Sequence, residues 1–233
     1  MTTNIFSYSR ITVVAALLLW IPAANGAGFT QIPLPDAAYT GSTSLIPITG
    51  MDGDTTLTLS DAFLTVTFSA LMQEFTVPTT WSSWGSPPAV ETSTPRVLSP
   101  VDFMNVTTVT LLFSKPLSTF GLEAEPDALA KYGAFPVTLD FFSGVTLLGS
   151  VSNSLDGSNA ALFAASSMTP ITSVTLTIAG NASVPEGTDP GIAQIRYALA
   201  PPQSVPEGGP STWLMVATVL ALFTVHRFRY ARN

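Results

Sequence analysis

The stretch Ile171-Thr-Ser-Val-Thr-Leu-Thr-Ile178 largely alternates apolar and hydroxyl side chains. In a β-strand successive side chains point to opposite faces, so this pattern predicts a strand with one face in an apolar core and the other in water. Threonine is β-branched and suits the wet face of a pleated surface. A half-buried strand of this kind needs antiparallel neighbours, and the pattern therefore favours an all-β fold.

The alternation recurs along the chain, and we expect further strands at Thr55–Ser60, Phe63–Phe68, Val106–Phe113, Val137–Phe142, Val145–Val151, Leu162–Ala164 and Ile192–Tyr197. Ser143-Gly144 has the composition of a two-residue hairpin turn between two of them. Outside the two ends, only Pro126–Lys131 is expected to form about one helical turn. Many short strands separated by Gly, Pro and Asp predict a single antiparallel, jelly-roll-like β-sandwich over residues 27–204.

Composition removes several classes of chemistry. The 233 residues include no cysteine, which excludes disulfides, thiol nucleophiles and cysteine-ligated metals. The single histidine, His226, lies beside arginines near the C-terminus, where we expect no catalytic triad and no histidine metal site. What remains is carboxylate chemistry, an oxygen-liganded metal, or no chemistry, and we expect the protein not to be an enzyme.

Charge argues against a nucleic-acid partner. The formal net charge is −7, but half of the eight basic residues lie near the two ends. Residues 27–204 keep four basic and fourteen acidic residues, a net charge of −10. An acidic domain with no basic stripe would be repelled by phosphate.

The N-terminus has the pattern of a signal peptide over residues 1–26. Arg10 is followed by an apolar run from Ile11 to Ile21 and then by small residues up to Ala27. We expect an N-terminal helix here and cleavage by signal peptidase between Gly26 and Ala27. A buried helix is the minor alternative.

The C-terminus, residues 205–233, has the pattern of a membrane anchor. A turn-forming linker over residues 205–212 precedes an apolar stretch over 211–225, and three arginines lie in the basic end, residues 226–233. The apolar stretch is shorter than the ~20 residues of a full span, but flanking aromatic and arginine side chains can extend it at the interface. The positive-inside rule then leaves the domain outside the cytoplasm.

This tail resembles the PEP-CTERM sorting tail of Gram-negative bacteria. The residues that carry the resemblance are Val205, Pro206, Glu207, Ser211, Thr212, Trp213, Arg227, Arg229 and Arg232. The resemblance implies a transient transmembrane helix, cut by an exosortase-type transpeptidase, in a protein associated with exopolysaccharide. Gly208-Gly209 before Pro210 departs from the usual Val-Pro-Glu-Pro-Ser pattern. A plain single-pass anchor is the alternative.

The resemblance extends into the domain, from about Asp61 to Ala198. It is carried by Trp81-Ser-Ser-Trp84-Gly-Ser-Pro-Pro88, Pro95-Arg-Val-Leu98, Phe120-Gly-Leu-Glu-Ala-Glu-Pro126 and Ile195-Arg-Tyr197. These segments are similar to a recurrent β-sandwich ectodomain of PEP-CTERM proteins. Such ectodomains often have acidic residues in the last strand, where this chain has Ala193-Gln194.

The acidic motifs have two interpretations each. Asp52-Gly53-Asp54 could offer carboxylates to calcium, but the full calcium-loop spacing is absent and a turn is favoured. Asp156-Gly157 and residues 186–191 are likewise expected to be turns first. Glu123 and Glu125 are two residues apart and would face the same side of a strand. Their mutual repulsion would need a cation, Arg96 or Arg196 as a counter-ion, or contact with solvent, and we expect solvent.

Trp81 and Trp84 lie in a loop rich in Pro and Ser. Exposed indoles could stack on sugar rings, whereas buried ones would fasten the loop to the core, which is the favoured interpretation. The sequence therefore predicts an exported, non-enzymatic surface or matrix protein: an inner-membrane-anchored precursor facing the periplasm, then a cell-surface or extracellular form. The alternative is a calcium-aided carbohydrate-binding module. A glycosidase built on two opposed carboxylates is the weakest hypothesis.

Overall fold

The computed structural model describes residues 28–101, 106–128 and 130–202. Its elements are β1 (Phe29–Ile32), α1 (Ala37–Ser42), β2 (Ser44–Leu45), β3 (Thr55–Ser60), β4 (Thr65–Thr76), β5 (Arg96–Pro100), β6 (Thr108–Pro126), the 3₁₀ turn η1 (Ala130–Tyr132), β7 (Phe135–Ser143), β8 (Thr146–Leu155), β9 (Ala161–Ile178) and β10 (Pro190–Leu199). All strand pairs are antiparallel. The predicted all-β, antiparallel class is confirmed.

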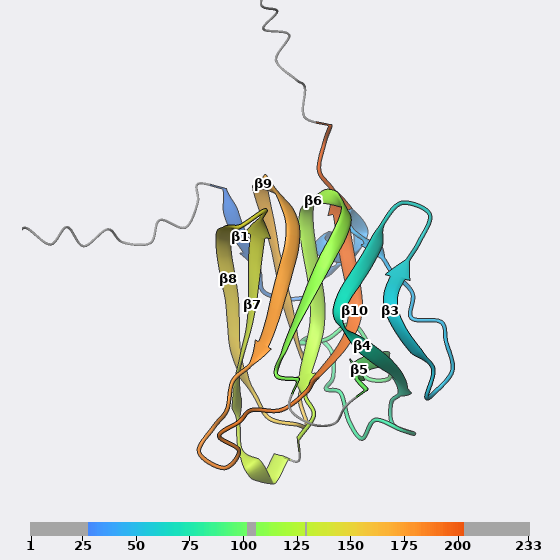
Figure 1. The fold of residues 1–233 in the computed structure, drawn as a ribbon, viewed down its shortest axis with the longest axis vertical. Coiled ribbons are helices and arrows are strands. Elements are labelled where there is room, and N and C mark those ends of the chain that lie inside the picture. Colours follow the sequence, from blue (N-terminus) through green and yellow to red (C-terminus); the bar gives the residue numbers. More distant parts are fainter. Residues whose placement is uncertain (1–27, 102–105, 129, 203–233) are drawn as a thin grey trace, which may run out of the picture.

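Ten strands form one sheet that folds over on itself (Figure 1). In the first layer, residues 111–113 of β6 pair with β4, and residues 108–112 of β6 pair with residues 173–177 of β9. β7 and β8 continue the layer. In the second layer, residues 117–126 of β6 pair with β10. Residues 161–166 of β9 pair with β6, and residues 164–167 of β9 pair with β1. The layers are therefore joined through strands that belong to both.

The bends have a cause in the sequence. The β6–β9 register is interrupted between Leu112 and Thr119 on β6, and Pro116 lies in this interval. Pro170 lies in the matching interval of β9. Proline has no N–H to donate to a ladder, and it is tolerated in strands where pairing is interrupted.

One apolar core lies between the layers. Alternation along β6 directs Leu122 and Ala124 into it, where they cluster with Val137 and Leu139 of β7 and Phe163 of β9. On the opposite face of the second layer lies a smaller cluster that includes Trp81, Trp84 and Val97. Apolar side chains therefore pack on both faces of the second layer.

The strands differ from the sequence expectations in number and in length, since β1, β2 and β5 were not predicted. β3 matches its predicted range, but Leu162–Ala164 and Ile171–Ile178 are parts of the single strand β9, because the chain bends there and does not turn back. The hairpin turn is Gly144-Val145, one residue later than expected, since Ser143 pairs with Thr146 and Gly144 takes the positive φ of 58°. The helical turn expected at Pro126–Lys131 shares only Ala130 and Lys131 with η1, because β6 continues to Pro126.

The structure contains one helix that the sequence analysis did not predict. α1 is only six residues long and shows no helical periodicity, but the carboxylate of Asp36 caps it by accepting a hydrogen bond from the Tyr39 N–H at 2.8 Å. Residues 1–26 and 205–233, for which the sequence analysis predicts a signal peptide and a sorting tail, lie outside the described residues. Within the described part of the chain, no helix combines the length and apolar character needed to cross a bilayer.

Candidate functional site

Two buried glutamates lie beneath the long loop of residues 77–95. Alternation along β6 places Glu123 and Glu125 on the face of the second layer that turns away from the main core. Their exposed fractions are 0% and 1%. The expectation that solvent surrounds this pair is wrong, because the loop covers the face on which both side chains lie.

The loop contacts each carboxylate through a tryptophan. The Trp84 Nε1–H donates to Glu123 Oε2 at 2.8 Å, and the backbone N–H of Glu91 donates to Glu123 Oε1 at 2.5 Å. The Trp81 Nε1–H donates to Glu125 Oε2 at 3.2 Å, and the Ser83 hydroxyl donates to Oε1 at 3.1 Å. All four carboxylate oxygens thus accept a hydrogen bond, which offsets part of the cost of burying them.

Burial dominates the acidity of both groups. Desolvation raises the pKa of Glu123 to about 7, although the Trp84 and Glu91 hydrogen bonds oppose it. Desolvation also raises the pKa of Glu125 to about 7, against the hydrogen bonds from Trp81 and Ser83. Groups with such a pKa suit proton transfer, but a general acid or base must reach its substrate, and these carboxyls are occupied by the loop.

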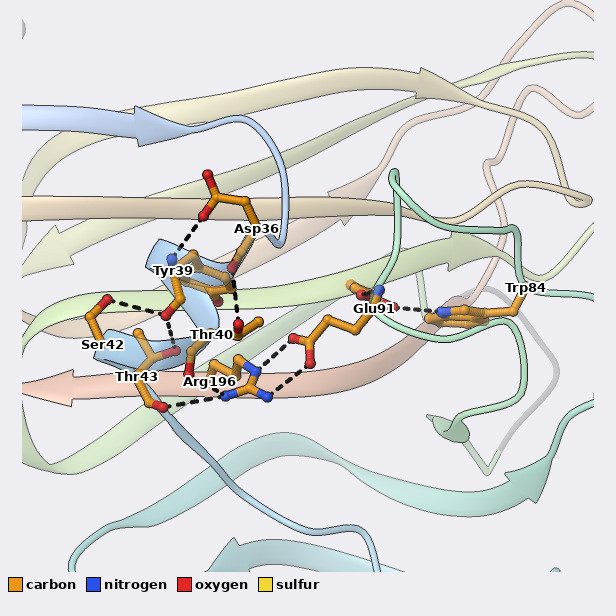
Figure 2. A network of polar contacts seen from close by, with 9 residues as sticks. Asp36, Tyr39, Thr40, Ser42, Thr43, Trp84, Glu91 and Arg196 are labelled. Carbon is orange, nitrogen blue, oxygen red and sulfur yellow. Dashed lines mark hydrogen bonds and ion pairs between the residues drawn. The ribbon is translucent and has the colours of Figure 1, made fainter.

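A second polar contact fastens the other end of the loop (Figure 2). Glu91 binds Arg196 of β10 through two parallel hydrogen bonds, Nε to Oε1 at 2.6 Å and a terminal nitrogen to Oε2 at 2.9 Å. The same guanidinium donates to the carbonyls of Thr40 and Thr43 at 3.3 Å, at the C-terminal end of α1. Arg196 therefore joins strand, loop and helix.

A β-bulge in β10 makes this contact geometrically available. The register shifts between Ala193 and Arg196, and Gln194 adopts a positive φ of 48°. As a result Ile192 and Ile195 both enter the main core, whereas Arg196 faces α1 and the loop. Ala193-Gln194, the segment that the sequence analysis compared with the last strand of PEP-CTERM ectodomains, thus lies at the bulge.

Trp81 and Trp84 are 6% and 1% exposed. Neither indole is open to solvent, so their burial gives no support to the hypothesis of a sugar-stacking pair, which stays a prediction. The alternative, two indoles that fasten the loop to the sheet, agrees with their hydrogen bonds to the glutamates. The edge of Trp81 also borders a pocket of about 210 Å³, which Thr80, Asp127 and Gly157 help to line.

The Asp52–Asp54 motif forms a turn. Asp54 Oδ2 accepts from the Met51 N–H at 2.8 Å, and Gly53 has a φ of +92°. Asp52 accepts from the hydroxyls of Thr76 and Thr80 at 2.6 and 2.9 Å. The Thr76 hydrogen bond is the main reason that the pKa of Asp52 is lowered. No set of three or more acidic or histidine side chains in the described ranges is arranged to hold a metal ion.

The sequence analysis missed how the arginines are used. Arg196 and Arg96 were considered as counter-ions of the glutamate pair, but their carboxylate partners are elsewhere. Arg196 binds Glu91, and Arg96 lies 3.1 Å from Glu74 and 3.5 Å from Asp52. Glu91 sits in an irregular loop, so no periodic pattern indicated that it would approach β10.

The fold and the loop site define an all-β, sandwich-like domain with a buried polar cluster. No protein-family model and no curated protein matches the chain. Among solved structures, an enzymatically active domain of bacteriophage CBA120 tailspike protein 4 aligns with 59% of this chain at 12% identity and a TM-score of 0.30. The CBM51-2 and INT domains of Clostridium perfringens ZmpB align with 72% at 10% identity and a TM-score of 0.37. The chain covers only 19% and 43% of these structures.

Proposed function

We propose that this chain is an exported, non-enzymatic bacterial surface or matrix protein, delivered by a signal peptide and processed through its PEP-CTERM-like tail. The observation that carries the proposal is where the strands begin and end. β1 begins at Phe29, just after the proposed cut between Gly26 and Ala27, and β10 ends at Leu199, before Val205. Neither processing event would remove a strand, so the domain could keep its sheet after both.

The chemistry of the domain supports a non-enzymatic role. The acidic side chains that burial would activate, Glu123 and Glu125, hold a loop in place and are not open to a substrate. On this proposal, the chemistry is performed on the protein by signal peptidase and by an exosortase-type enzyme. Its surface function would be structural, in association with exopolysaccharide.

The carbohydrate-binding alternative receives no support from the residues first assigned to it. Trp81 and Trp84 are buried, and Asp52 and Asp54 are engaged by hydroxyl and backbone donors within the chain. A calcium-aided module would need other residues on the surface. We therefore retain the structural function as the conclusion.

The intact mass of the protein recovered from its native cells tests this proposal. We expect a chain that begins at Ala27 and has lost its C-terminal residues from a position near Pro206-Glu207. Pro206→Ala should reduce the C-terminal cut, and Pro201→Ala, a proline outside the motif, should leave it unchanged. A wild-type chain that still ends at Asn233 would refute processing, and one that still begins at Met1 would refute export.

A further inference from the structure

Strand β8 forms a long, open edge of the sheet. It lies at one end of the strand order and pairs only with β7 among the described residues, and Figure 1 shows it as the outermost strand on the left. Its ten residues, Thr-Leu-Leu-Gly-Ser-Val-Ser-Asn-Ser-Leu, include no charge and no proline. Proteins usually protect such edges with charges, prolines, bulges or short strands.

The other free edges carry that protection. β2 has two residues and β1 has four, so both offer few backbone groups to which a further strand could bind. β3 has six residues and a register shift between Thr56 and Thr58. β8 is the long exception: its own register shift, at Leu148, lies near its start, and residues 149–155 pair with β7 without interruption.

The direction of its backbone groups follows from the hydrogen bonds of β7. The Pro136 carbonyl accepts from the Ala179 N–H, so Pro136 and the residues of the same parity, Thr138 and Asp140, direct their backbone groups toward β9. Their partners on β8, residues 154, 152 and 150, form the non-hydrogen-bonded pairs of the β7–β8 ladder. Consequently Ser150, Ser152 and Ser154 direct their N–H and C=O groups away from the sheet.

The Ser154 N–H supports this assignment. It donates to the side chain of its own neighbour, Asn153 Oδ1, at 2.8 Å, and not to a carbonyl of β7. Asn153 therefore covers one outward donor at the end of the strand. In the part of the chain that the structure describes, no side chain covers the outward N–H and C=O groups of Ser150 and Ser152 in this way.

We propose that β8 pairs antiparallel with β8 of a second copy of this chain, with Ser150 opposite Ser152 of the partner. This register is self-complementary. A two-fold axis beside Val151 places Ser150 of each copy opposite Ser152 of the other, and both of these pairs are hydrogen-bonded pairs of the new ladder. β8 itself carries no charge, whereas residues 27–204 carry a net charge of −10. A carboxylate beside the seam, Asp140 of β7, accepts a hydrogen bond from the Ser150 hydroxyl of its own chain. The side chains of β8 therefore bring no like charges of their own to a contact between two copies.

The exposed face of the first layer continues across this seam. Hydroxyl side chains already meet between its strands, as in the Thr138–Ser152 pair at 3.0 Å and the Thr110–Thr175 pair at 3.1 Å. Ser150 opposite Ser152 of a second copy would add one more pair of the same kind in each direction. The interaction makes one sheet from two domains and does not depend on how the chain ends are processed.

A charge test uses the purified full-length chain in mild detergent, with the association state measured by sedimentation velocity. The double variant Ser150→Lys with Ser152→Lys opposes lysines across the seam and should weaken the dimer at least about tenfold. Ser150→Lys with Ser152→Asp opposes unlike charges and should restore it. The control, Thr108→Lys with Thr110→Lys, adds the same charge on β6 in the middle of the sheet and should not weaken it. A monomeric wild type, or equal weakening by the control, would overturn the proposal.

A cross-linking test reads the register and uses the absence of native cysteine. Hydrogen-bonded antiparallel pairs have Cα atoms about 5.5 Å apart, within the range of a disulfide, whereas diagonal neighbours are about 7–8 Å apart. Mixing Ser150→Cys with Ser152→Cys chains should give cross-linked dimers on mild oxidation, several-fold more than either variant alone or Thr110→Cys. Equal yields in all samples would refute the register, and circular dichroism of each variant shows that it is folded.

Discussion

The buried pair Glu123 and Glu125 should make the protein less stable as the pH rises toward neutrality. Each carboxyl has a pKa of about 7 in the folded chain, against an ordinary value of 4.5. Between these pH values the folded chain keeps the proton and the unfolded chain loses it. The folded state binds more protons, so these two carboxyls make the free energy of unfolding fall with pH over this window and add no pH dependence on either side of it.

The size of the effect follows from the same numbers. A pKa difference of about 2.5 at about 1.4 kcal/mol per pH unit gives about 3 kcal/mol for each carboxyl, an order-of-magnitude figure. Asp127 contributes in the same direction, because burial and the nearby Asp189 raise its pKa. Asp52, Asp61 and Asp156 have lowered pKa values, and their contributions therefore fall below this window.

Urea unfolding followed by circular dichroism at pH values from 4.5 to 8 measures the effect. Glu123→Gln and Glu125→Gln keep a carbonyl oxygen for the indole N–H and remove the ionisation. Each should reduce the pH-dependent loss by about 3 kcal/mol, and the double variant should remove most of it. Glu186→Gln, at an exposed position, is the matched control. A double variant with the wild-type pH dependence would refute the reasoning.

Two further substitutions probe the packing around this site. Gly121→Ala places a Cβ 2.4 Å from both the Ala164 Cβ and the Tyr39 hydroxyl, so it should lower the free energy of unfolding in urea titrations by about 1–3 kcal/mol. The control Gly41→Ala adds a Cβ with nothing within 4 Å and should not lower it. Equal effects of the two substitutions would contradict the close packing at Gly121. Glu91→Gln removes the carboxylate that binds Arg196, and it should lower the free energy of unfolding by about 2 kcal/mol. It should also speed proteolysis within residues 77–95. An unchanged cleavage rate would show that the ion pair does not hold the loop.

The strand pattern was predictable because it depends on local alternation. Thr55–Ser60 was predicted at its observed bounds, and the periodic parts of β6 and β9 were recognised. Their full lengths were not, because the bends near Pro116 and Pro170 resemble turns in sequence and only tertiary pairing shows that the strand continues.

The candidate site was predictable only in part. The two-residue spacing correctly placed Glu123 and Glu125 on one side of a strand. Their burial could not be inferred, since it depends on a loop that returns from residues 77–95 to cover β6. The contact between Glu91 and Arg196 joins positions far apart in the chain, and no local pattern encodes it.

The strands shared by both layers have a consequence for how the domain loses its structure. Residues 108–126 of β6 and 161–178 of β9 run through both halves, and removing either strand would break the ladders of both layers together. A sandwich of two separate sheets can in principle loosen one sheet at a time. Here amide hydrogens in both halves should exchange with a common opening free energy, as one cooperative unit.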